Sequence, residues 1–351
     1  MRLLLVSEHL PEREGTASGR LVRAAGEGLV AAGHQVTVVG WTEREPREEL
    51  PPWARWQPVH RGHGLRDHAA ALVRPRWASS ALQLADDLAQ DFDVSCAEDP
   101  LSWAAVARSQ RTAVVVHYSC LLDAKALGGV RLHDLQGHRA DRRAVRRATV
   151  PLSYSRRVGS ALGGRAGWVP AAVLLPDEAV PVVSAPRALM LAGWDWPANS
   201  AALRDLLAAW PEVRARVPGA ELLLAGRGCP DVRADGVRVL GEVPRAADAF
   251  AEAAVLAFPC PRTSGPKTKV LEALAAGLPV VTTAAGVEGL ARPDGCWTAA
   301  TPSFAETLAT ALADEPARAS AAAAGRAMVA TEHSPAAAAA ARIAAFARVV
   351  P

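Results

Sequence analysis

The chain has 351 residues and a formal net charge of +3, and half of its residues are hydrophobic. This length suits two domains that each bury a core, and the apolar content excludes a disordered chain. The small charge does not indicate a nucleic-acid partner, and no apolar run reaches the roughly 20 residues of a membrane span, so we expect a cytoplasmic protein.

The N-terminal half alternates short apolar strands with amphipathic helices. Its apolar start is too short for a signal peptide and predicts a buried first strand instead. The predicted strands cover residues 3–6, 35–39, 94–97 and 113–116. The predicted helices cover residues 20–32, 79–88, 101–109, 133–147 and 156–162. A loop is expected over 11–19, and the segment 46–75, rich in Pro, Trp and charge, is predicted to be irregular.

A second alternating series follows residues 169–186, whose four prolines and weak periodicity predict a linker between domains. Its strands are predicted over 188–192, 221–225, 237–240, 255–259 and 280–283. Its helices are predicted over 200–210, 245–253 and 268–276, before a mostly helical tail that Pro335 breaks, with a last helix over about 336–348.

Two such series predict an α/β fold of two Rossmann-like, doubly wound parallel-sheet domains with ligands at the carboxyl ends of the strands. We expect an N-terminal domain over 1–175 and a C-terminal domain over 176–335. The segment 336–351 is expected to pack back on the N-terminal domain.

Lys267 and Lys269 are two of only three lysines in a chain whose other cations are arginines. They lie where a loop after an apolar strand enters a helix. Because a helix amino end disfavours cations unless an anion binds there, two lysines and the backbone N–H groups predict a phosphate site. Glu272, one turn further, can reach the ribose hydroxyls of a nucleotide. Two solvated lysines on a surface loop remain the alternative.

The same stretch resembles the donor-binding segment of the GT-B glycosyltransferases of glycosyltransferase family 4. Members often read Gly-Thr-Arg-x-Lys-x-x-Glu-Ala-x-Ala-x-Gly-x-Pro-Val-Val, followed by Gly-x-Glu-Gly-Leu. From Gly265 this chain reads Gly-Pro-Lys-Thr-Lys-Val-Leu-Glu-Ala-Leu-Ala-Ala-Gly-Leu-Pro-Val-Val, and from Gly286 it reads Gly-Val-Glu-Gly-Leu. Residues 193–199, 217–228 and 240–244 are similar to further donor-side segments. The resemblance implies a GT-B fold whose two domains face a central cleft, with the acceptor in the first domain and the donor in the second.

The resemblance also implies a role for each matching residue. Lys267 and Lys269 would hold the diphosphate and stabilise the leaving group, and Glu272 would bind the ribose. The remaining donor contacts would come from Gly265, Thr268, Trp194, Asn199, Arg227, Gly228, Glu242 and Val243.

The chain also departs from the family. Ser264 stands where many members carry the first Glu of a Glu-x7-Glu pattern. Trp194 and Asn199 or Ser200 stand where others place an Arg and a Lys. We interpret these differences as a change in the way that the phosphate is held.

Two candidate sites fall in the N-terminal half. Gly15 and Thr16 lie in the loop before the first long helix, where the family has a glycine-rich loop against donor phosphate and acceptor, although a plain mobile turn is the alternative. His117 ends a strand where the family often has a histidine that contacts the transferred sugar. A hydrogen-bonded structural histidine is the alternative.

Three other features receive no site role. Glu98 and Asp99 could contact an acceptor, but a helix cap is the favoured interpretation. Asp91 and Asp93 spell a metal-binding Asp-x-Asp of another fold, yet they precede a strand. The scattered cysteines offer no zinc site, so no metal is expected. An arginine-rich helix could hold an acidic acceptor or an anionic membrane face, but it has too few apolar residues for stable insertion. A solvated or ion-paired face is expected for Arg139, Arg142, Arg143, Arg146 and Arg147.

The sequence therefore predicts a retaining, metal-independent glycosyltransferase without a cofactor. The donor would be a UDP-, GDP- or dTDP-sugar, and the acceptor a hydroxyl of a small molecule or glycan. A nucleotide-sugar 2-epimerase on the same fold and an inactive nucleotide-sugar-binding module are the alternatives. The oligomeric state is not indicated.

Overall fold

The computed structural model describes residues 1–58 and 92–350, and the helix predicted over 79–88 lies outside them. The chain divides into two compact units. Unit 1 comprises Met1–Leu121, Val130–Ala172 and Pro335–Pro351, and unit 2 comprises Leu122–Gly129 and Val173–Ser334.

Unit 1 is built on a parallel seven-stranded sheet of order β3-β2-β1-β4-β5-β6-β7. Its strands are β1 Arg2–Ser7, β2 Gln35–Thr42, β3 Ala54–Pro58, β4 Val94–Ala97, β5 Thr112–Val116, β6 Val150–Ser153 and β7 Gly167–Trp168. The prediction of an irregular segment over 46–75 is wrong at β3. This edge strand has no apolar alternation, because one neighbour and much solvent surround it. The sequence also did not predict the short strands β6 and β7.

Most helices of unit 1 connect these strands along the sequence, and the last one follows unit 2. They are α1 Ala17–Ala31, the 3-10 turn Pro100–Ser102, α4 Trp103–Val106, α5 Cys120–Ala126, α6 Leu132–Arg147, α7 Arg156–Ala161 and α13 Pro335–Phe346. The first two residues of α5 belong to unit 1 and the rest to unit 2. The loop predicted over 11–19 ends early, because Thr16 caps α1 by accepting a hydrogen bond from the Gly19 N–H at 3.1 Å.

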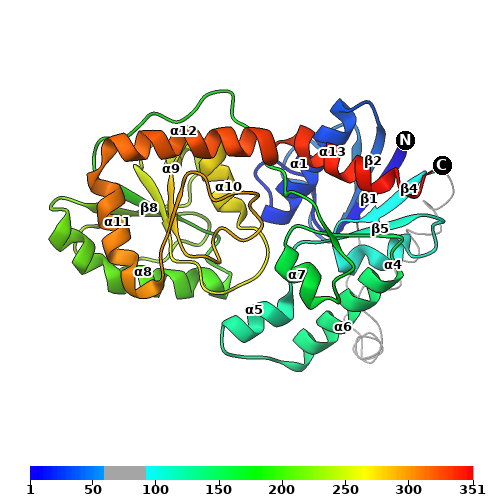
Figure 1. Cartoon of the computed structure of the whole chain (residues 1–351), viewed down its shortest axis with the longest axis horizontal. Helices are drawn as coiled ribbons and strands as arrows, with labels where there is room; N and C mark the ends of the chain where they lie inside the picture. Colours follow the sequence, from blue (N-terminus) through cyan, green and yellow to red (C-terminus); the bar gives the residue numbers. More distant parts are fainter. Residues whose placement is uncertain (59–91, 351) are drawn as a thin grey trace. The chain divides into compact units, whose positions relative to one another are not determined.

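The last helix, α13, lies alongside α1 (Figure 1). Gly28 makes this close packing possible, since a Cβ atom there would lie 2.0 Å from the carbonyl oxygen of Pro335.

The Gly28→Ala substitution is expected to destabilise the protein by about 1–3 kcal/mol through overpacking, measured by urea unfolding. Gly137→Ala on α6, where a Cβ meets nothing within 4 Å, is the control and is expected to stabilise by up to about 1 kcal/mol. Equal stabilities for the two variants would contradict this account of the helix contact.

Unit 2 is built on a parallel six-stranded sheet of order β10-β9-β8-β11-β12-β13. Its strands are β8 Arg187–Leu191, β9 Glu221–Ala225, β10 Val237–Gly241, β11 Val255–Phe258, β12 Val280–Thr282 and β13 Cys296–Thr298. Its helices are α8 Pro197–Arg216, α9 Ala246–Phe250, α10 Thr268–Ala275, α11 Phe304–Ala313 and α12 Glu315–Glu332 (Figure 1). The sequence did not predict β13.

The helix α8 is longer at both ends than the predicted 200–210. It begins at Pro197. Proline suits the first helical turn because the backbone N–H that it lacks would have no partner within the helix there. It also continues through Pro211, since the buried side chains of Trp210 and Val213 hold both sides of that proline in the core. Asn199 consequently lies in the first turn of a helix and not in a loop.

Candidate functional site

The loop after β11 turns into α10 through Gly265, whose φ of +76° favours glycine. Lys267 is the N-cap residue of α10 and is 4% exposed. Its ammonium donates to the carbonyl oxygens of Gly265 at 2.5 Å, Ser264 at 3.1 Å and Thr263 at 3.5 Å. An ammonium has three N–H donors, so this lysine is fully used in holding its own loop.

Lys269 is placed differently, although it is only two residues further along. Its ammonium donates to the Oδ1 atom of Asn199 at 2.7 Å and lies 4.1 Å from the centre of the Phe258 ring. The Asn199 amide in turn donates to the carbonyl oxygen of Gly193 at 2.7 Å, which fixes its orientation. Within the described residues this is the one hydrogen bond of the Lys269 ammonium, so two of its three N–H donors make no hydrogen bond there.

Burial lowers the pKa of Lys269 to about 7, and the positive charge of Lys267 adds to this effect. Cys260 and Glu272 act in the opposite direction. Glu272 lies three residues after Lys269, on the same face of α10 and partly exposed. A cation held at this cost beside a carboxylate is typical of a functional site that receives an anion.

Two carboxylates from other segments of the chain bind the loop before α10, and the sequence did not indicate either of them as a site residue. The Oδ1 atom of Asp123 accepts from both the N–H and the hydroxyl of Ser264, at 2.6 and 2.7 Å. The Oε1 atom of Glu288 accepts from the Gly265 N–H at 2.9 Å. These loop amides are therefore occupied, and burial raises the pKa of Asp123. No local pattern could have linked Asp123 to a loop 141 residues away.

The other candidate residues of unit 2 follow the carboxyl ends of β8, β9 and β10. The Trp194 indole donates to the carbonyl oxygen of Ala225 at 3.0 Å, and its backbone N–H donates to that of Arg227 at 3.1 Å. Arg227 is exposed and pairs with Asp195 at 2.9 Å. Three further candidates lie in the same loops, the exposed Gly228 and Glu242 and the partly exposed Val243. The structure thus brings these loops together at the carboxyl ends of the strands, where Lys269 also lies. Thr268 is buried in the first turn of α10.

In unit 1, His117 directly follows β5 and is 5% exposed. Its ring lies 4.8 Å from that of Tyr154, which directly follows the neighbouring strand β6. The Nε2 atom of His117 is buried and has no hydrogen-bond partner within the described residues. Burial lowers the pKa of His117 to about 3, so the imidazole is uncharged at neutral pH.

The loop that carries Gly15 and Thr16 is a capping structure. The Thr16 hydroxyl caps α1 and lies 3.2 Å from the Nδ1 atom of His9, and the carbonyl oxygen of Gly15 accepts from Arg20 at 2.6 Å. Asp99 caps the 3-10 turn by accepting from the Ser102 N–H at 2.7 Å, which confirms the interpretation of this residue as a cap.

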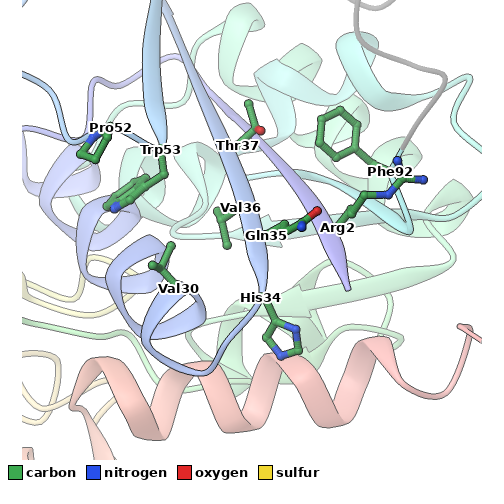
Figure 2. Close-up of a pocket in the computed structure, with 9 residues that line it drawn as sticks. All are labelled: Arg2, Val30, His34, Gln35, Val36, Thr37, Pro52, Trp53 and Phe92. Atoms are coloured by element: carbon green, nitrogen blue, oxygen red, sulfur yellow. The ribbon is translucent and has the colours of Figure 1, made fainter.

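A cavity of about 450 Å³ lies at the amino ends of β1 and β2 in the unit 1 sheet, the opposite end of the strands from His117 (Figure 2). Arg2, His34 and Thr37 line it together with the rings of Trp53 and Phe92. Ligands of parallel α/β sheets bind at the carboxyl ends of the strands. This cavity therefore lies away from the edge that carries His117.

The described ranges 1–58 and 92–350 contain no group of three or more His, Cys, Asp or Glu side chains arranged to hold a metal. Asp93 accepts a hydrogen bond from the Arg2 N–H at 2.7 Å, and Asp91 lies outside these ranges. The five arginines of α6 are exposed, as predicted. No helix in the described part of the chain is long and apolar enough to cross a bilayer.

Two parallel-sheet α/β units, with a lysine-bearing loop at the carboxyl edge of the second, define the class: the protein is a glycosyltransferase of the GT-B fold. More specifically, residues 185–314, which lie in unit 2, match the family model described as Glycosyl transferases group 1. The fold and the enzyme class predicted from the sequence are confirmed. A comparison with the sequences of curated proteins finds no match.

Solved structures share the fold along the whole chain. Sucrose-phosphate synthase from Thermosynechococcus elongatus superposes with a TM-score of 0.73 at 15% identity, covering 99% of both chains. A mutant of S. aureus TarM in complex with Fondaparinux, alpha-GlcNAc-glycerol and UDP gives 0.75 at 8% identity, covering 99% of this chain and 100% of the other. Anabaena HepE in complex with UDP and glucose gives 0.67 at 12% identity, covering 99% of both chains. At such identities the likeness establishes the fold.

Proposed function

We propose that the protein is a retaining, metal-independent glycosyltransferase of family 4 that moves a sugar from a nucleotide-diphospho-sugar to a hydroxyl acceptor. The observation that carries this proposal is the ammonium of Lys269, half-buried in the first turn of α10 with a single hydrogen bond within the described residues. A diphosphate supplies the negative charge that stabilises such a cation. The UDP in the TarM and HepE complexes supports a nucleotide donor.

The reaction needs charge stabilisation more than it needs a protein nucleophile. The acceptor oxygen forms a bond to the anomeric carbon as the bond from that carbon to the β-phosphate oxygen breaks. The acceptor proton passes to the departing diphosphate, and attack from the same face retains the configuration. Lys269 and the amino end of α10 stabilise the charge that grows on the leaving group. Lys267 holds the loop in the shape that presents Lys269.

The remaining candidates have separate proposed roles. Glu272 binds the ribose, and the loops with Trp194, Arg227 and Val243 flank the rest of the nucleotide. In unit 1, His117 contacts the transferred sugar, and the edge around it receives the acceptor. We propose a small-molecule or glycan acceptor that arrives from water, since the exposed Leu132 and Leu135 of α6 are too few for deep insertion into lipid.

The experiment that tests this function begins with thermal-shift measurements against UDP, GDP and dTDP, followed by the sugar nucleotides of the base that binds. The protein is then incubated with the donor alone and with pooled hydroxyl acceptors, and the products are read by mass spectrometry and NMR. Transfer with retained anomeric configuration is the expected result. A changed sugar without acceptor would identify an epimerase, and binding with neither transfer nor donor hydrolysis would identify a binding module.

Donor binding is expected to weaken as the pH rises above about 7. The free enzyme must hold Lys269 as an ammonium to bind the diphosphate, and burial sets its pKa to about 7. Each further pH unit should therefore raise the dissociation constant of a sugar nucleotide about tenfold until other groups titrate. Calorimetry between pH 6 and 9 measures this slope. Lys269→Arg, which stays charged, is the control and should give a flat profile. A flat wild-type profile would exclude Lys269 as the titrating ligand.

A further inference from the structure

The last helix carries a charge into the core of unit 1. Arg342 of α13 is fully buried, and its guanidinium binds both carboxylate oxygens of Glu98, at 2.5 and 2.8 Å. Glu98 is also fully buried and directly follows β4. The pair is bidentate, which is the arrangement that best offsets the cost of burying two charges.

The same guanidinium reaches the surroundings of His117. It donates to the Tyr154 hydroxyl at 2.6 Å, and the Tyr154 ring lies 4.8 Å from the His117 ring. Glu98, His117 and Tyr154 each follow one of the adjacent strands β4, β5 and β6, so they form a row along the carboxyl edge of the sheet. The row is arranged around Arg342, which comes from the far end of the sequence.

The charges around His117 have opposing effects on its imidazole. Burial is the main cause of the low pKa of the ring; Glu98 favours a proton on it, whereas His9, from the loop after β1, and Arg342 disfavour one. Burial opposes the ionisation of Glu98, but Arg342 lowers the pKa of this carboxyl below its ordinary value. Without Arg342, the buried Glu98 carboxylate would lose the guanidinium that both of its oxygens bind, and a proton taken up by this carboxyl or by the neighbouring imidazole would compensate for the lost charge.

We propose that Arg342 is a positioning residue for His117: by binding Glu98 and Tyr154 it fixes the imidazole at the carboxyl ends of the strands and, together with burial, keeps it uncharged. This inference rests on the proposed function insofar as His117 contacts the transferred sugar. Glycosyl transfer passes through an anomeric carbon that gains positive charge, as in glycoside hydrolysis. An uncharged imidazole leaves that charge undisturbed, while an imidazolium would oppose it.

The test compares Arg342→Met, Glu98→Gln and the double variant. NMR of ¹⁵N-histidine-labelled protein reports the protonation of each ring, and His117→Gln assigns the signals. In the wild type and in Glu98→Gln, His117 should stay uncharged from pH 5 to 9. In Arg342→Met it should titrate within that range, with turnover falling more than about tenfold on the acid side. The double variant should restore the uncharged ring and the wild-type pH profile, because neither buried charge remains.

A purely structural role for Arg342 would leave the double variant as impaired as the single one, or leave His117 uncharged in Arg342→Met, and either result would overturn the proposal. If Arg342→Met does not fold, Arg342→Lys and the double variant carry the test, and a charged imidazole at pH 7 in either would overturn it. The NMR measurement needs no substrate. Wild-type turnover in His117→Gln would therefore reject the sugar contact without affecting the inference about Arg342.

Discussion

The Lys269→Met variant is expected to lose activity and gain stability. Its turnover should fall by at least tenfold to about a hundredfold, the effect of removing a principal electrostatic donor to a transition state. Its ligand-free form should melt at a higher temperature than the wild type at pH 6 to 7. Methionine keeps the length of the side chain and its contact with the Phe258 ring, but it carries no charge into the buried site.

The gain in stability follows from the pKa of Lys269. It is about 7 in the folded protein and 10.5 ordinarily. Between these values the unfolded chain binds more protons, so the contribution of Lys269 to stability rises with pH across this window. Well below pH 7, both states are protonated and the full cost of holding the ammonium in the protein remains. The advantage of Lys269→Met should therefore be largest near pH 6 and shrink toward pH 10.

Thermal melts at several pH values and steady-state turnover measure the two halves of this prediction. Lys125→Met is the matched control, since Lys125 is exposed on α5 and should leave both quantities unchanged. Wild-type turnover in Lys269→Met would remove this residue from the site. A variant that is both inactive and less stable would show that Lys269 supports the fold, which would contradict the expected stability cost of its charge.

The Glu272→Ala variant is expected to lower kcat/KM for the donor about tenfold to a hundredfold. A carboxylate that accepts hydrogen bonds from ribose hydroxyls makes charge-assisted contacts that alanine cannot replace. Glu272→Gln keeps the size and one acceptor, so it should lose less. Steady-state kinetics and calorimetry with the nucleotide diphosphate measure the loss.

The ribose contact has its own control on the ligand side. A 2′,3′-dideoxy nucleotide diphosphate lacks both hydroxyls, so wild type and Glu272→Ala should bind it with the same affinity. If Glu272→Ala weakens the dideoxy and the ordinary nucleotide equally, the carboxylate acts elsewhere. Glu272 would then act through Lys269, whose pKa it raises.

The site as predicted from the sequence and the site in the structure differ most at Lys267. Both lysines were expected to hold the diphosphate, because both flank the amino end of α10. In the structure, the backbone turn at Gly265 directs three carbonyl oxygens to Lys267, while Lys269 points to Asn199 and Phe258. Spacing along a sequence places two side chains near one helix end, but it does not say which of them the loop will bind.

The sequence by itself determined the two α/β units, the loop and helix of the donor segment, and His117 at a strand end, because these depend on local periodicity and on residues adjacent in the chain. It did not determine the edge strand β3, since few partners impose a pattern there. Only the tertiary structure decided the contacts of Asp123 with Ser264 and of Arg342 with Glu98, which join positions 141 and 244 residues apart. Buried charges must find partners wherever the fold brings them, and a pairing of that kind leaves no trace in the local sequence.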